Sequence, residues 1–174
     1  EKYHKEDGLT SYELGFHAEY TTKREILEGI SELSKKYHAP IYTHNSESAS
    51  EVAQCVERTG MTPTVYMEQL GLFEYGGGLY HCVHMSEEDL DVVKRHQISV
   101  ITNPASNLKL ASGIAPIEEM LKRNIDLAIG TDGPASNNCL DMFREMFLVT
   151  ALAKYRENDA SAVDAAEVLK MATT

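Results

Sequence analysis

The stretch IDLAIGTDGPASNN at residues 125–138 decides the fold class, because a short apolar strand runs directly into a turn that carries a carboxylate. Asp132 stands in that turn among small residues. An α/β barrel presents catalytic and metal-binding carboxylates at the carboxyl ends of its strands in this way. The same residues also suit an Asp that caps the next helix or stabilises the turn, so the stretch alone leaves both roles open.

The composition excludes several classes of partner. A formal net charge of −11 argues against nucleic acid and against an anionic membrane. No run of residues is apolar enough to span a bilayer, and from the given residues we expect no signal peptide. The 3 cysteines are widely spaced and odd in number, which argues against a disulfide framework and favours a cytoplasmic location.

Strand-like and helical patterns alternate along the chain. We expect residues 1–13 to form a loop or linker and residues 14–174 to form one folded unit. Short apolar strands are predicted, and most are followed by helical patterns, at residues 12–16, 40–43, 79–80, 98–102 and 125–129. The glycines at 76–78 are expected to break the chain before the third of these strands. Two further helices are predicted at residues 140–155 and 160–171.

Strands that are apolar on both faces and alternate with helices predict parallel β/α units. The pattern gives about five such units, whereas a closed eight-unit barrel takes roughly 250 residues, more than the 174 of this chain. Two architectures therefore remain open: a doubly wound open sheet, or the later part of a (β/α)₈ barrel.

Local signals mark where several helices begin. Residues 22–25 form a capping-box pattern that predicts a helix to residue 36, with Ile26, Leu27, Ile30 and Leu33 on its apolar face. A second helix is expected to begin at Pro63, because proline suits the first helical turn. Ser86 is expected to cap a third.

Two histidine motifs follow predicted strands. His44 stands at the end of one strand with Glu47 three residues on, and an imidazole beside a carboxylate can bind a divalent metal and move protons. A surface histidine with a solvated glutamate is the simpler interpretation of this pair alone. In the motif HCVH we favour His81 as the functional residue, His84 as a structural hydrogen-bonding residue, and Cys82 as a small core residue.

Polar side chains also follow the other strands. The run NPASN at residues 103–107 suggests a proline-stiffened turn whose Ser106 and Asn107 bind a polar substrate, although ordinary turn chemistry predicts the same residues. Because the carboxyl ends of parallel strands converge, His44, His81 and Asp132 can meet in space. Two histidines and one aspartate are ligands suited to Zn²⁺ or Fe²⁺.

These motifs resemble the amidohydrolase superfamily, and specifically its S-adenosylhomocysteine/5'-methylthioadenosine deaminase and chlorohydrolase branch. The resemblance extends from about residue 15 to the end of the chain. It rests on four strings: HNSE at 44–47, HCVH at 81–84, NPASNLKLASGIAPI at 103–117 and GTDGPASNN at 130–138. It implies a distorted (β/α)₈ barrel, of which this chain forms about the last five β/α units with carboxyl-terminal helices.

The resemblance also implies a role for each candidate residue. His44 and Asp132 would ligate one divalent metal, for which zinc is favoured over iron or manganese. Asp132 would also take a proton from the attacking water. Glu47 would protonate the purine ring and contact the substrate, His81 would orient the nucleophile, and His17 would contact the substrate. The implied reaction is attack of metal-activated hydroxide on C6 of an adenine ring, with loss of ammonia.

Two alternatives stay open beside deamination of S-adenosylhomocysteine, 5'-methylthioadenosine or adenosine. The first is a related aminohydrolase or chlorohydrolase that acts on guanine or an s-triazine. The second is a catalytically inert barrel fragment without a metal, because the HxH pair that supplies two ligands in the family is absent from this sequence. The string HAEY at 17–20 also replaces the usual HSPY-like string. We expect a piece of a longer protein with a small-molecule substrate, and assembly into a homo-oligomer is left open.

Overall fold

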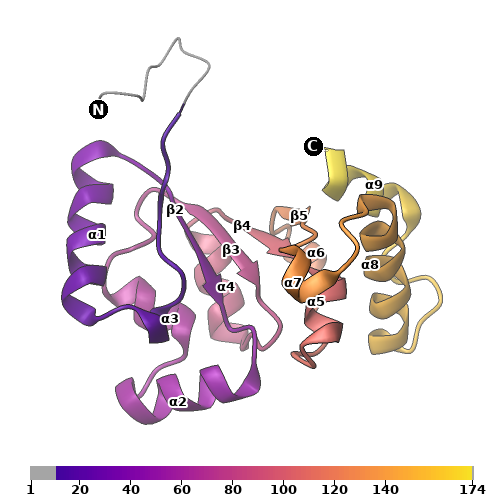
Figure 1. The fold of residues 1–174 in the computed structure, drawn as a ribbon, viewed down its shortest axis with the longest axis horizontal. Helices are drawn as coiled ribbons and strands as arrows, with labels where there is room; N and C mark the ends of the chain where they lie inside the picture. The colour runs from indigo at the N-terminus through magenta and orange to yellow at the C-terminus, as the bar shows by residue number, and fades with distance from the viewer. Residues whose placement is uncertain (1–10, 174) are drawn as a thin grey trace.

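The computed structural model describes residues 11–173, and its centre is a parallel sheet of five strands in sequence order (Figure 1). The strands are β1 (Leu14–Gly15), β2 (Ile41–Asn45), β3 (Gly77–His81), β4 (Ile98–Thr102) and β5 (Leu127–Ile129). A doubly wound sheet reverses its strand order at a switch point, whereas a barrel wall adds each strand beside the last. The predicted partial barrel is therefore confirmed, and the doubly wound alternative is wrong.

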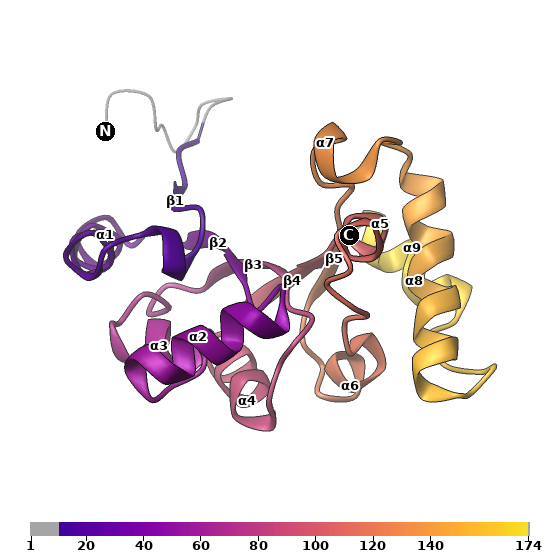
Figure 2. The same ribbon diagram turned by 60° about the horizontal axis from the view of Figure 1, so that its bottom comes forward.

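Helices cover one face of the sheet, as Figure 2 shows for α2, α3, α4 and α6. Within the sheet, β2 and β4 alternate buried and half-buried residues, so the other face is only partly covered. The expectation of strands buried on both faces is wrong for this face. The helices are η1 (Glu19–Thr21), α1 (Arg24–Tyr37), α2 (Ala49–Thr59), α3 (Pro63–Gln69), α4 (Glu87–Arg95), α5 (Pro104–Lys109), α6 (Ile117–Lys122), α7 (Pro134–Asn137), α8 (Met142–Glu157) and α9 (Ala165–Thr173).

The predicted helix starts have different outcomes. Pro63 is the first residue of α3, and the Ser86 hydroxyl accepts a hydrogen bond from the Asp89 amide at the start of α4, as expected. The capping box at residues 22–25 is wrong. The turn η1 ends at Thr21 and Thr22 caps its end, so Lys23 becomes the N-cap of α1.

The apolar face predicted for α1 is only partly buried. Leu27 is buried and Ile30 packs against the core, whereas Ile26 and Leu33 are 54% and 43% exposed. The reason is the position of α1 at the edge of the fold, beside the two-residue strand β1 (Figure 2).

Two predicted loops are regular structure. The run NPASN forms the start of α5 instead of a turn, because Pro104 occupies the first helical position, for which its backbone is already suited. The glycines expected to precede the third strand partly belong to it, since β3 begins at Gly77. A Cβ atom on Gly77 would lie 1.9 Å from the carbonyl oxygen of Ile41, so only glycine allows β2 and β3 to approach this closely.

The core lies between the sheet and the helices that cover it. Its fully buried side chains include Leu79 of β3, Val100 of β4 and Phe73 in the segment that follows α3. Cys55 and Cys82 are buried in the same cluster, and both are free thiols. The interpretation of Cys82 as a small core residue is thus confirmed. In the described part of the chain, no helix is long and apolar enough to cross a membrane.

The two buried thiols predict a loss of stability at alkaline pH. Burial raises the pKa of Cys55 to about 11 and that of Cys82 to about 12, from an ordinary value of 9.0. The unfolded thiols ionise near pH 9, while the folded ones stay protonated. Below that pH, both states are protonated and the thiols do not reduce the free energy of unfolding. Above it, each thiol lowers the free energy of unfolding by up to about 1.4 kcal/mol per pH unit until the folded thiol ionises.

Urea unfolding at about pH 8 and about pH 10 measures this effect. The variant Cys82→Ala should lose less stability between the two pH values than the parent protein does. The exposed Cys139 provides the matched control, and Cys139→Ala should behave as the parent. An unchanged pH dependence in Cys82→Ala would contradict the assignment.

Candidate active site

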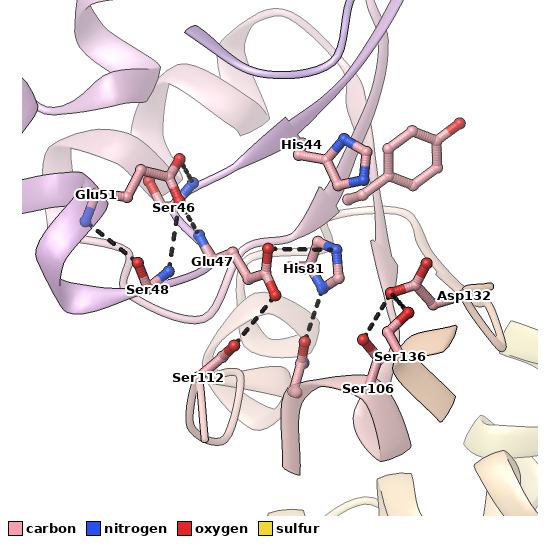
Figure 3. A network of polar contacts seen from close by, with 12 residues as sticks. His44, Ser46, Glu47, Ser48, Glu51, His81, Ser106, Ser112, Asp132 and Ser136 are labelled. Carbon is pink, nitrogen blue, oxygen red and sulfur yellow. Dashed lines mark hydrogen bonds and ion pairs between the residues drawn. The ribbon is translucent and has the colours of Figure 1, made fainter. Parts of the chain in front are cut away.

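The residues predicted to carry chemistry meet at the carboxyl ends of the strands (Figure 3). The register of β2 and β3 places Asn45 opposite His81, so the segments that follow the two strands leave the sheet side by side. The rings of His44 and His81 stack with their centroids 5.3 Å apart. Asp132 follows β5 and lies on the same side of the sheet as His81.

A backbone carbonyl orients His44. The Nδ1 atom of His44 lies 2.7 Å from the carbonyl oxygen of His17, and because that oxygen can only accept, Nδ1 carries the proton. Nε2 therefore keeps its lone pair. Metal-binding histidines are typically oriented in this way, with the other ring nitrogen bonded to a carbonyl or carboxylate.

The side chain of His17 itself is exposed beside His44. The two ring centroids lie 4.7 Å apart, and the Nδ1 atom of His17 lies 3.0 Å from the Thr21 hydroxyl. The imidazole of His17 therefore stands at the open mouth of the site, while its carbonyl group orients His44.

Three hydrogen bonds hold the carboxylate of Asp132. Oδ2 accepts from the hydroxyls of Ser106 (2.6 Å) and Ser136 (2.8 Å), and Oδ1 accepts from the Gly133 amide (2.6 Å). Burial alone would raise the pKa of Asp132, but these bonds together with His81 outweigh it and lower the pKa below its ordinary value. A carboxylate has about four lone-pair positions, so one remains for a further ligand.

His81 and Glu47 are held toward each other. The buried His81 ring donates from Nδ1 to the Asn107 side-chain oxygen at 2.7 Å, which turns Nε2 toward Glu47. Nε2 lies 3.9 Å from Oε2 of Glu47, whose other oxygen accepts from the Ser112 hydroxyl at 3.1 Å. Nε2 of His84 bonds the Ser112 carbonyl at 2.7 Å, so its predicted structural role is confirmed.

Ser106 and Asn107 take a different place from the one expected. They are 0% and 1% exposed, and their side chains contact Asp132 and His81. The prediction that they bind the substrate directly does not fit this geometry, because the helix α5 turns both side chains inward.

Sequence reasoning missed two buried carboxylates that hold these segments. Glu51 is 7% exposed and accepts hydrogen bonds from the loop that carries Glu47. Glu145 of α8 is 0% exposed, and its oxygens accept from the Ala105 amide at 3.0 Å and the Asn137 side chain at 2.8 Å. Asn137 in turn donates to the Thr131 carbonyl at 2.6 Å, next to Asp132.

Both missed residues have signals in the sequence. Ser48 and Glu51 are spaced as a capping box, which the structure forms. Glu145 lies four and eight residues before Val149 and Ala153, which are also buried, so it occupies the apolar stripe of α8.

The donors fit a divalent metal in kind and supply only part of a site. His44 offers a ring nitrogen and Asp132 a carboxylate oxygen, which are both zinc ligands. Within residues 11–173, no group of three or more His, Cys, Asp or Glu is arranged to hold a metal. A catalytic zinc site uses three protein ligands, so at least one donor must come from elsewhere.

Comparisons with known proteins show the family to which the chain is similar. The model of the amidohydrolase family matches residues 1–174. A 5-methylthioadenosine/S-adenosylhomocysteine deaminase of Caldanaerobacter subterraneus is 45% identical over 169 residues, which are 97% of this chain and 39% of that protein. A 5'-deoxyadenosine deaminase of Methanocaldococcus jannaschii is 40% identical over 161 residues, which are 92% of this chain and 38% of that protein.

Among solved structures, an adenosine deaminase from Xanthomonas campestris with bound zinc has the same fold. It matches with a TM-score of 0.92 and 38% identity, over 97% of this chain and 38% of that one. The resemblance predicted from the sequence motifs is therefore confirmed.

The contacts of Glu145 predict a large effect of its removal. Glu145→Ala leaves the Ala105 amide and the Asn137 side chain without their buried acceptor, which should lower the free energy of unfolding by about 2–5 kcal/mol. Urea unfolding measures the change. Glu157→Ala, at the exposed end of the same helix, should stay within about 0.5 kcal/mol of the parent. Equal effects of the two substitutions would show that Glu145 does not hold these segments.

Proposed function

The chain belongs to the amidohydrolase family, and from this premise we propose that its residues act in the hydrolytic deamination of an adenosine-type nucleoside. S-adenosylhomocysteine, 5'-methylthioadenosine and adenosine are the candidate substrates. The observation that carries the proposal is the convergence of His44, Glu47, His81 and Asp132 at one edge of the sheet. The chain spans about 39% of the length of the Caldanaerobacter relative, so the activity is proposed for a protein to which these residues contribute.

His44 and Asp132 are the residues we assign to a divalent metal. Zinc is the preferred ion, supported by the zinc in the Xanthomonas structure, with iron or manganese as alternatives. When bound, such a metal lowers the pKa of a water toward about 7 and so supplies hydroxide at neutral pH. The remaining donors would come from outside residues 11–173 or from another chain.

The chain's own residues divide the proton transfers among them. Asp132 is ionised at neutral pH, as an aspartate of ordinary pKa would be, and its hydrogen bonds lower the pKa further. In the proposed reaction it accepts a proton from the attacking water. Glu47 is positioned by Ser112 and donates a proton to the purine ring nitrogen. His81 orients the nucleophile. The water oxygen bonds to C6, the proton held by Asp132 passes to the amino nitrogen, and the bond from C6 to that nitrogen breaks to release ammonia. The proton on the ring nitrogen stays with the product, and the remaining proton of the water oxygen returns to Glu47 as the C6 carbonyl forms.

The remaining candidate residues have supporting roles. The exposed imidazole of His17 beside His44 supports contact with the substrate at the mouth of the site. We assign Ser106 and Asn107 to positioning, since they bond Asp132 and His81. A cytoplasmic location, supported by the free thiols, and assembly into a homo-oligomer stay predictions.

One observation favours an inert alternative, namely the two donors that residues 11–173 supply where a catalytic zinc needs three. Metal analysis decides between the two, because stoichiometric zinc contradicts inertness and its absence from the folded protein supports it. Ammonia release from a panel of adenosine derivatives tests the proposed reaction. Release from guanine, or chloride release from an s-triazine, would instead support a related hydrolase.

The assigned roles predict two kinds of variant. Asp132→Asn and His44→Ala remove metal donors, so metal content and ammonia release should fall together. Glu47→Gln keeps both donors but cannot protonate the ring, so it should retain the metal while turnover falls by about 10²-fold or more. Parallel metal analysis and ammonia assays measure both properties. Normal turnover in Glu47→Gln would refute the role of Glu47.

A further inference from the structure

A buried carboxylate that the proposed reaction does not use holds the loop that carries Glu47 (Figure 3). Oε1 of Glu51 accepts from the Ser46 amide at 2.9 Å. Oε2 accepts from the amides of Glu47 at 2.8 Å and Ser48 at 3.4 Å. Three successive amides therefore converge on one carboxylate, which is the arrangement that backbone groups use to bind an anion.

Capping of α2 explains only the weakest of these bonds. In a capping box, the glutamate at the third helical position bonds the amide of the N-cap, here Ser48. The two shorter bonds reach beyond the cap to residues outside the helix. The capping box of α4 differs, because among the described residues Asp89 bonds no amide outside its own cap. Its Oδ2 accepts from the amide and hydroxyl of the N-cap Ser86, and its Oδ1 accepts from the Thr62 hydroxyl.

The loop needs such a support because its backbone is strained. Ser46 has φ of +48°, a left-handed conformation that is unfavourable for a non-glycine residue. Its hydroxyl is buried without a hydrogen-bond partner among the described residues, so the side chain does not stabilise this conformation. The backbone stabilises it, since the Ser46 carbonyl accepts hydrogen bonds from the amides of Val83 (3.1 Å) and His84 (3.0 Å).

The same contacts connect the two histidine segments. The Ser46 amide is bonded to Glu51 and its carbonyl to the segment that follows His81, so Ser46 lies between the carboxylate of Glu51 and the loop after β3. Glu47 is the next residue, and its carboxylate lies 3.9 Å from His81. A shift of the 46–48 backbone would therefore change the distance between Glu47 and His81.

We propose that Glu51 is a positioning residue for Glu47, which fixes the backbone of residues 46–48 so that the Glu47 carboxylate faces His81 and the substrate. This inference rests on the proposed function, because it assigns the role of Glu51 through the proton transfer by Glu47. The hydrogen bonds of the Glu51 carboxylate go to the backbone of residues 46–48, and among the described residues none goes to His44 or Asp132.

Glu51→Gln tests the proposal in the metal-loaded protein. The amide group replaces one acceptor oxygen by a donor, which opposes a backbone N–H on one side of the loop. We expect kcat to fall by about 10²-fold with little change in KM, as for a misplaced catalytic group, and metal content to stay unchanged. Asp89→Asn is the matched control in the capping box of α4 and should keep the parent kcat.

A double-mutant cycle separates positioning from a general structural effect. If Glu51 acts through Glu47, then Glu51→Gln should lower kcat by less than about threefold in a Glu47→Gln background. If Glu51→Gln lowers kcat by the same factor in the parent protein and in the Glu47→Gln background, the proposal is overturned. An equal loss of kcat in Asp89→Asn would also overturn it.

Amide hydrogen exchange of the unsubstituted protein gives a readout that needs neither a variant nor activity. The amides of Ser46 and Glu47 precede α2, and their protection depends on Glu51 as acceptor. We expect both amides to exchange more slowly than an open loop by a factor of at least about 10². Exchange at the rate of a free loop would overturn the proposal. Protected amides in a protein without deaminase activity would instead contradict only the proposed function.

Discussion

The parallel pairing of β2 with β3 is the constraint on which the site depends. The pairing sets Asn45 beside His81, so the histidine that ends β3 faces the segment HNSE that ends β2. The sheet then adds β4 and β5 in the same direction, and the carboxyl end of β5 brings Asp132 to the same edge. Residues that lie far apart in the chain become neighbours because the strands are parallel and in sequence order.

Strained backbone and buried hydrogen bonds occur together at these strand ends. Ser46, His81, Cys82 and Asp132 all have positive φ values, between 48° and 70°. Each such residue costs of order 1–3 kcal/mol and persists only where its surroundings hold it. Carboxylates and backbone groups supply that support, since Glu51 binds the loop amides, Glu145 binds α5 and Asn137, and the Ser46 carbonyl binds the segment after His81. The residues of the site are thus held in place by hydrogen bonds from groups that have no part in the proposed reaction.

Periodicity and turn residues in the sequence were enough to predict the parallel β/α units and the residues at the strand ends. The strand at Ile98–Thr102 and the cap at Ser86 depend on local signals, which is why they were predicted correctly. The capping box predicted at residues 22–25 does not form, because Thr22 caps the end of the preceding turn η1. The inward direction of Ser106 and Asn107, and the support from Glu51 and Glu145, depend on tertiary contacts that a local pattern does not contain.

The central claim is that His44 and Asp132 bind one metal in a deaminase site. Anomalous diffraction at the zinc edge, from crystals of the zinc-loaded protein, tests it directly. We expect a single peak about 2.0–2.2 Å from both Nε2 of His44 and a carboxylate oxygen of Asp132, the distances of zinc–ligand bonds. A peak at another place, or one that contacts only one of the two residues, would contradict the account.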